Sequence, residues 1–74
     1  GKDYKTLLQE YVQRDGDKHI VYRLLSESGP DHAKTFHMVV EINGVTYEAG
    51  SGKSKKIAEQ HAAQLTLEKL MADK

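Results

Sequence analysis

The amino-acid sequence predicts an α+β domain in the order α-β-β-β-α, with two helices packed on one face of a three-stranded antiparallel sheet. Helical periodicity occurs near the two ends of the chain, and strand-like segments fill the middle. The strongest short hairpin signal, Asn43-Gly44, joins the last two of these segments. We find no repeat or linker, so residues 1–74 are expected to form one domain, with its helices and strands between about residues 3 and 72.

The first helix is predicted from the segment DYKTLLQEYVQR, residues 3–14. Asp3 is a suitable N-cap residue, and the turn residues Asp15, Gly16 and Asp17 end the helix. Apolar side chains recur at helical spacing and define one buried face: Tyr4, Leu7, Leu8, Tyr11 and Val12.

Three strands are predicted next. Residues 20–28, IVYRLLSES, are rich in β-branched and apolar side chains and stop at Gly29-Pro30. Residues 35–42, TFHMVVEI, alternate, which puts Phe36, Met38, Val40 and Ile42 on a buried face and His37, Val39 and Glu41 on the other. Residues 45–49, VTYEA, return after a type I′ turn, which requires positive φ at two residues that Asn and Gly tolerate.

The closing helix is predicted over residues 55–72, KKIAEQHAAQLTLEKLMA, with Ser54 as its N-cap. Its small residues Ala58, Ala62 and Ala63 would let the helix approach the sheet closely. The four tyrosines are expected to contribute to the core.

Composition excludes several classes of protein. The chain has no cysteine, so disulfides and thiolate metal sites are absent, and burial of apolar surface must supply the stability. No apolar run approaches the roughly 20 residues of a membrane span, and nothing resembles a signal peptide, so we expect a cytoplasmic protein without membrane contact. Eleven basic and eleven acidic side chains cancel, but Lys53, Lys55 and Lys56 form a local positive patch.

The segment Gly52-Lys53-Ser54 matches the end of the nucleotide-binding P-loop pattern G-x-x-x-x-G-K-S/T. The first glycine of that pattern is missing, because the position five residues before Gly52 is Tyr47. A P-loop enzyme also needs a parallel sheet, for which this short antiparallel pattern leaves no room. The sequence therefore argues against nucleotide hydrolysis.

The start of the closing helix is instead a candidate phosphate site. Free N–H groups at a helix N-terminus carry partial positive charge, and Lys53, Lys55 and Lys56 add full charges around Ser54. Such a site suits the backbone of a polyanion. The alternative is a solvated lysine cluster that binds nothing.

Two further segments favour the hypothesis that the start of the closing helix binds phosphate. Thr6, Gln9 and Glu10, followed by Gln13, share a polar face of the first helix whose amides and carboxylate suit 2′-hydroxyls in an RNA minor groove. The loop Gly29-Pro30-Asp31-His32 is stiffened by proline, which is expected to present its carbonyl outward and His32 at an exposed tip. Taken alone, the helix face fits a solvated surface better, and the loop is an ordinary hairpin loop.

Together, these segments resemble the double-stranded RNA-binding domain family. The resemblance covers essentially the whole chain and rests on LQEYVQ in the first helix, Gly29-Pro30-x-His32, Phe36, the glycine-rich start of the closing helix and its alanines. Within the family, the chain is most similar to the C-terminal domain of bacterial ribonuclease III, because of its DYKTLLQEYVQR, GPDH and KSKKIAEQHAAQ segments.

The resemblance implies shape-selective binding of double-stranded RNA, which is presented to an attached ribonuclease III catalytic domain. It implies that the first-helix face enters one minor groove, the loop enters the next, and the lysine patch contacts phosphates between them. The implied RNA-binding residues are Thr6, Gln9, Glu10, Pro30, His32, Lys53, Ser54, Lys55 and Lys56.

One position departs from the family pattern. Glu59 stands where many members have a third lysine, which predicts weaker phosphate binding, and the neighbouring His61 is expected to offset this in part. The histidines share no short ligand spacing, so neither a metal nor a cofactor is expected in this domain.

The same resemblance assigns catalysis to another part of the parent protein. The carboxylates that bind Mg²⁺ and the dimer interface would belong to a catalytic domain outside this chain, so the chain itself is expected to be monomeric and not to cleave RNA. The alternative function is a protein-interaction or dimerisation module, for which Leu65, Leu67, Leu70 and Met71 would supply a partly exposed apolar strip.

Overall fold

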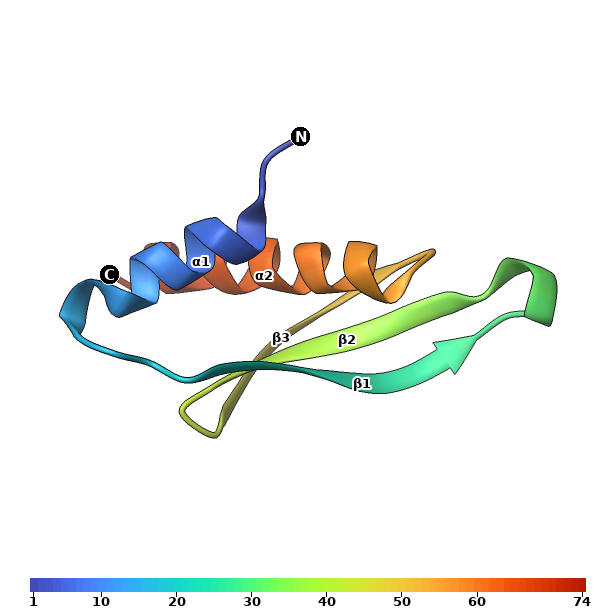
Figure 1. Ribbon diagram of the computed structural model, residues 1–74, viewed down its shortest axis with the longest axis horizontal. Helices are drawn as coiled ribbons and strands as arrows, with labels where there is room; N and C mark the ends of the chain where they lie inside the picture. Colours follow the sequence, from blue (N-terminus) through green and yellow to red (C-terminus); the bar gives the residue numbers. More distant parts are fainter.

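The computed structural model describes all 74 residues and confirms the predicted fold class. Both helices lie on one face of the sheet, and the hairpin that joins the first two strands extends beyond them (Figure 1). The elements in chain order are α1 (Tyr4–Val12), β1 (Ile20–Ser28), β2 (Thr35–Ile42), β3 (Val45–Gly52) and α2 (Lys55–Ala72).

Most element boundaries agree with the predictions, and two differ. α1 ends at Val12, and the predicted last turn is a 3₁₀ turn over Gln13–Asp15. β3 continues to Gly52 rather than stopping at Ala49, because Gly50, Ser51 and Gly52 all pair with β2. A second 3₁₀ turn, Asp31–Ala33, forms the tip of the loop between β1 and β2.

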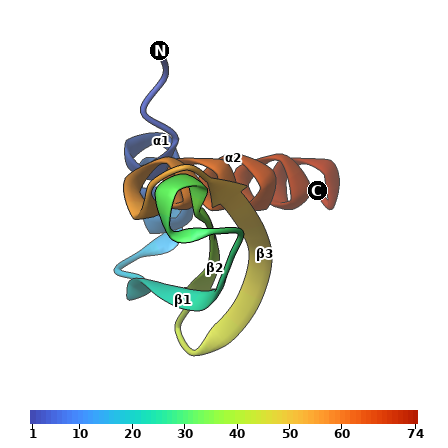
Figure 2. The same ribbon diagram turned by 90° about the vertical axis from the view of Figure 1, so that its right-hand side faces the viewer.

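The sheet has the order β1-β2-β3 with both pairs antiparallel. Figure 2 shows the helices on one side and the curved strands on the other. Asn43 and Gly44 both have positive φ, 50° and 80°, which confirms the predicted turn between β2 and β3. Asn43 also accepts a hydrogen bond on Oδ1 from the His19 backbone N–H at 2.8 Å, so this turn anchors the start of β1.

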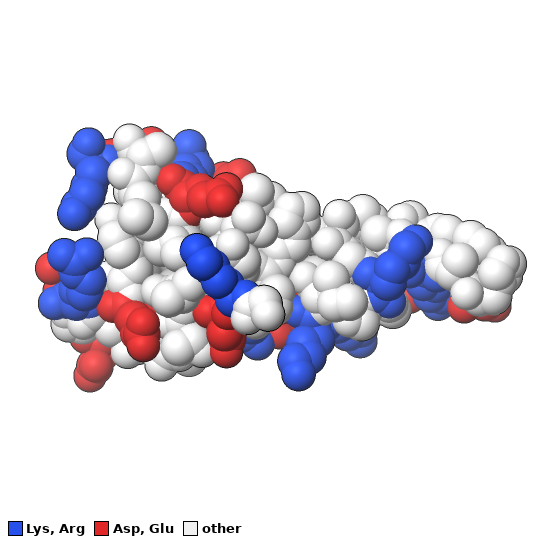
Figure 3. Space-filling model, turned by 90° about the horizontal axis from the view of Figure 1, so that it is seen from above, with Lys and Arg blue, Asp and Glu red and all other residues white.

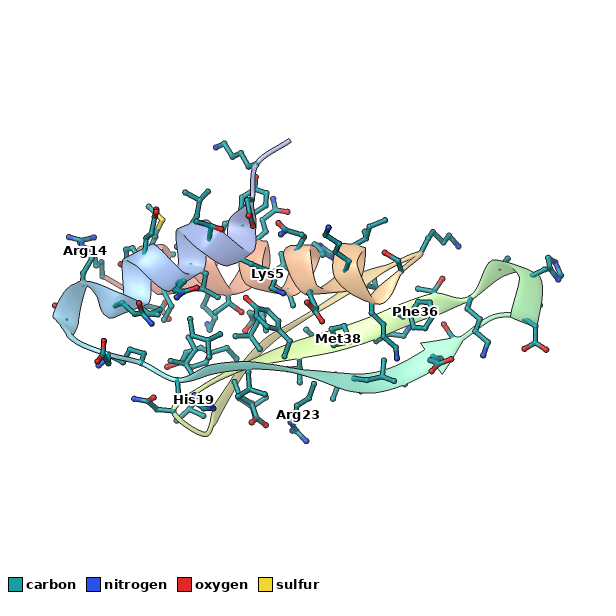
Figure 4. All side chains as sticks on the ribbon, in the orientation of Figure 1. Lys5, Arg14, His19, Arg23, Phe36 and Met38 are labelled. Atoms are coloured by element: carbon teal, nitrogen blue, oxygen red, sulfur yellow. The ribbon has the colours of Figure 1, made fainter.

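The predicted inner face of β2 is buried at Met38, Val40 and Ile42, but Val39 on the opposite face is buried as well, contrary to the prediction of a single buried face. Val39 was expected on the open face, yet only 2% of its surface is exposed. It lies on the central strand between Arg23 and Ala49, and the Arg23–Glu41 ion pair, 2.6 Å long, lies on the same side of the sheet. Arg23, its register partner on β1, points away from the helices (Figure 4), so Val39 lies on the face of the sheet opposite the helices.

The core joins α1, β2 and α2 and consists of Leu8, Val12, Val40, Ile42, Ala62 and Ala63. All four tyrosines pack against it in partly buried positions, as predicted. Leu7 is an exception to the predicted buried face of α1, since 37% of it is exposed. Ala58, Ala62 and Ala63 are fully buried, which confirms the close approach of α2 to the sheet.

Candidate nucleic-acid interface

The N-terminus of α2 is organised as the sequence predicts. Ser54 is the N-cap, and its hydroxyl oxygen accepts a hydrogen bond from the Ile57 backbone N–H at 3.1 Å. The Ser54 hydroxyl hydrogen remains available to donate to an anion. Lys53, Lys55 and Lys56 are exposed around this helix end, where the macrodipole also favours negative charge. The arrangement can hold a phosphate group.

Lys53 extends the positive patch towards the loop between β1 and β2. Its ammonium nitrogen lies 3.4 Å from the Thr35 hydroxyl oxygen. Lys53 also lines, together with His32 and Phe36, a surface hollow of about 480 Å³ beside the loop. The lysine patch and the loop therefore meet at one surface.

The loop is held in shape by its own backbone. Gly29 has a φ of +88°, and a Cβ at this position would lie 2.8 Å from the Ala33 carbonyl oxygen, so glycine is required here. The expectation that Pro30 presents its carbonyl outward is wrong, because this oxygen accepts the Ala33 N–H at 2.9 Å and closes the 3₁₀ turn. His32 is exposed at the tip, as predicted.

The polar face of α1 is also exposed at Thr6, Gln9 and Glu10. The Thr6 hydroxyl donates to Asp3 Oδ2 at 2.8 Å, so this hydroxyl is left as an acceptor. Hydrogen bonds from Gln60 first, and from Thr6 second, lower the pKa of the Asp3 carboxyl to about 2. Asp3 thus stays ionised at neutral pH and caps the helix.

Glu59 does not face the lysine patch as a free negative charge. Its carboxylate accepts from Lys5 Nζ at 2.6 Å, and its side chain is only 22% exposed. The same ammonium lies 4.6 Å from the centre of the Tyr22 ring. Burial, followed by the nearby Glu59 and Asp3 charges, raises the pKa of Tyr22 to about 12. Lys5 therefore offsets the negative charge of Glu59, while the prediction of weaker phosphate binding, which rests on the missing third lysine, stays a prediction.

One nitrogen of the His61 ring is bound to β3. Its Nδ1 accepts a hydrogen bond from the Ser51 backbone N–H at 3.0 Å, so the ring faces β3 and Nδ1 carries no proton. Only Nε2 of this ring remains to donate a hydrogen bond to a phosphate.

The three surfaces follow one another along the molecule. Figure 1 shows the loop at the far end of the β1–β2 hairpin, the start of α2 nearer the centre, and α1 beside α2. The molecule measures 42 Å along its longest axis. Seen from the helix side, most visible acidic side chains lie at the wide end, and basic side chains are spread from the wide end to beyond the middle of the molecule (Figure 3).

Two residues of this region were not predicted from the sequence, Lys5 and Gln60. Lys5 lies between α1 and the sheet (Figure 4), and Gln60 binds the first turn of α1. No local pattern could identify them, because their partners are 54 to 57 residues away along the chain.

Some sites are absent. No group of three or more His, Cys, Asp or Glu side chains is placed to hold a metal ion. None of the helices combines the length and the apolar character needed to cross a membrane.

The fold and the three surfaces define a class of small α-β-β-β-α domains that present polar and basic groups to a polyanion. The chain belongs to the family described as the double-stranded RNA binding motif, whose model matches residues 4–70.

Comparisons with individual proteins agree with this assignment. The chain is 57% identical over 68 residues to Ribonuclease 3 of Streptococcus mutans serotype c, covering 92% of this chain and 29% of that protein. It is 52% identical over 69 residues to Ribonuclease 3 of Streptococcus pyogenes serotype M1, covering 93% of this chain and 30% of that protein. The chain thus spans less than a third of the length of these curated relatives.

Two solved structures share the fold. The first dsRBD of protein HYL1 matches with a TM-score of 0.69 and 34% identity, covering 90% of this chain and 94% of that one. The second dsRBD of DRB4 matches with a TM-score of 0.63 and 37% identity, covering 92% of this chain and 94% of that one.

Proposed function

We propose that this chain binds double-stranded RNA by shape and positions it for a ribonuclease III catalytic domain in the same parent protein. The observation that carries the proposal is the start of α2, where a Ser54-capped helix N-terminus is surrounded by Lys53, Lys55 and Lys56. These groups contact phosphates of one major groove, while the surfaces on either side reach the neighbouring minor grooves.

In this arrangement, Thr6, Gln9 and Glu10 on α1 contact 2′-hydroxyls of one minor groove. Pro30 and His32 enter the next. The 42 Å long axis of the domain supports contacts that are spread over two grooves. The fixed shape of the loop supports binding with little loss of conformational entropy.

Comparing RNA with DNA tests this function directly. We expect a duplex RNA of about 16 to 20 base pairs to bind much more tightly than a DNA duplex of equal sequence, because B-form DNA lacks 2′-hydroxyls and has different groove widths. Affinities measured by fluorescence anisotropy at about 0.15 M salt provide the comparison. Equal affinity for the two duplexes would contradict the proposal that Gln9 and Glu10 contact the minor groove.

The loop gives a second test, through His32→Ala. We expect this change to cost about 0.5–1.5 kcal/mol of binding to a long RNA duplex, the value of one hydrogen bond, without altering stability. A duplex of about 8 base pairs is the control, because it presents only one of the two minor grooves. The substitution should weaken binding to this short duplex much less. Equal losses on both duplexes, or a melting temperature lowered by several degrees, would assign the loop a structural role.

The proposal for the parent protein rests on the relatives named Ribonuclease 3, of which this chain matches 29 to 30% of the length. The remaining part would bind Mg²⁺, dimerise and cleave RNA in the cytoplasm. This chain would act as a monomeric binding domain without a cofactor. Incubated with duplex RNA and Mg²⁺, it should leave the RNA intact.

The alternative, a protein-interaction module, receives less support. Leu67 and Leu70 are partly buried against the core, so only part of the predicted strip is exposed. Met71 is 56% exposed but is the only large exposed apolar side chain in the second half of α2. Self-association that is indifferent to RNA would favour this alternative.

A further inference from the structure

Gln60 joins the two helices through both ends of its side-chain amide. Its Oε1 accepts a hydrogen bond from the Tyr4 backbone N–H at 2.7 Å, and its Nε2 donates to Asp3 Oδ1 at 2.8 Å. Asp3 in turn accepts from the Thr6 backbone N–H at 3.2 Å and from the Thr6 hydroxyl at 2.8 Å. One side chain of α2 therefore holds the first amide of α1 and the carboxylate that caps it.

This contact has a large influence on α1, because the helix is short. With nine residues, α1 is below the length at which an isolated helix is stable in water, so contacts with the rest of the domain must fix its position. The Lys5–Glu59 ion pair is a second link between the helices. Lys5 follows Tyr4 on α1, and Glu59 precedes Gln60 on α2. Both links join the first turn of α1 to the second turn of α2.

The proposed RNA contacts of α1 and α2 lie in these two turns or one turn away from them. Lys55 and Lys56 begin α2 one turn before Gln60, and Thr6 belongs to the Asp3 cap itself. Gln9 and Glu10 follow one turn later on α1. A shift of α1 along α2 would therefore change the distance between the minor-groove surface and the phosphate-binding surface.

We propose that Gln60, acting through Asp3, is a positioning residue that sets the preference of this domain for RNA over DNA; this inference rests on the proposed function. Hydrogen bonds to 2′-hydroxyls weaken steeply with distance and angle, so they require α1 at one position. Long lysine side chains reach phosphates over a range of positions. Displacement of α1 removes the sugar contacts and leaves the phosphate contacts.

Gln60→Ala tests the inference, and Gln64→Ala is a matched control. Gln64 lies on the same helix, but its amide only donates to Glu68 at 3.2 Å within that helix. We expect Gln60→Ala to weaken binding to a 20-base-pair RNA about tenfold, to weaken DNA binding about twofold or less, and to leave the salt dependence unchanged. Gln64→Ala should bind both duplexes as the unmodified chain does.

A reciprocal pair of changes separates positioning from loss of a side chain. Gln60→Glu places a second carboxylate against Asp3 and should reproduce the loss of RNA preference. Adding Asp3→Asn removes one of the two facing carboxylates and keeps a residue that can cap α1, so the double variant should regain part of the preference. All variants are compared at a temperature where circular dichroism shows each to be fully folded.

The outcomes distinguish this inference from the proposed function. If the unmodified chain binds RNA and DNA equally, the proposed function fails and the inference fails with it. If the unmodified chain prefers RNA and Gln60→Ala keeps that preference, only the inference is overturned. Equal losses on RNA and DNA would show that Gln60 is merely structural, and would also overturn it.

Discussion

Replacing both Lys55 and Lys56 by alanine should lower the affinity for every duplex RNA roughly 100-fold near 0.1 M salt, whatever its sequence. Each lysine removed takes away a charge-assisted hydrogen bond worth about 1.5–3 kcal/mol. The phosphate contacts also release condensed counterions, so the slope of log affinity against log salt should fall by about one unit per contact, or about two units in total. Titrations at several salt concentrations measure both quantities.

The chain contains a control of equal charge for this experiment. Lys69 lies near the C-terminal end of α2, where it pairs with Asp73 at 3.8 Å, and Lys74 is the last residue. Alanine at both positions removes the same two charges far from the start of α2. This control should keep nearly the full salt slope. If replacing Lys55 and Lys56 left the salt slope unchanged, the proposal that these lysines contact phosphates would be wrong.

The largest effect on stability is expected from Gly50→Ala. A Cβ at this position would lie 2.2 Å from the Ala62 backbone nitrogen, 2.6 Å from the His61 carbonyl carbon and 2.8 Å from the Ala62 Cα. These are backbone atoms of α2, so no side-chain rotation can relieve the overlap, and the helix must move away from β3. We expect a loss of at least about 3 kcal/mol.

Such a loss is a large part of the total. A chain of 74 residues typically has an unfolding free energy of about 4–11 kcal/mol. The melting temperature should fall by more than about 12 °C, as measured by circular dichroism. Ala49→Val is the control, because it adds atoms at the preceding, exposed position of β3 and should change stability by less than about 0.5 kcal/mol. Comparable losses from both variants would contradict the close approach of α2 at Gly50.

Local signals in the sequence determined the elements of this protein. Alternation in residues 35–42 defined β2, the Asn43-Gly44 pair defined the turn after it, and Ser54 defined the start of α2. Each of these signals depends on residues that are neighbours along the chain, where geometry follows from backbone conformation and side-chain period. For the same reason, the exposure of Lys55, Lys56 and His32 could be predicted, because helix ends and loop tips lie at the surface.

Only the tertiary structure decided how these elements act on one another. Glu59 was identified only as a departure from the lysine of the family pattern, and the structure pairs its carboxylate with Lys5, 54 residues away. The Ser51 amide binds His61 Nδ1, so only Nε2 of this ring is left for the phosphate contact expected from the sequence. The link from Gln60 to Asp3 joins positions 57 residues apart and gives no sequence signal at either end. Such contacts depend on where packing of the core places α1 and α2 against the sheet, and neither local propensity nor periodicity contains that information.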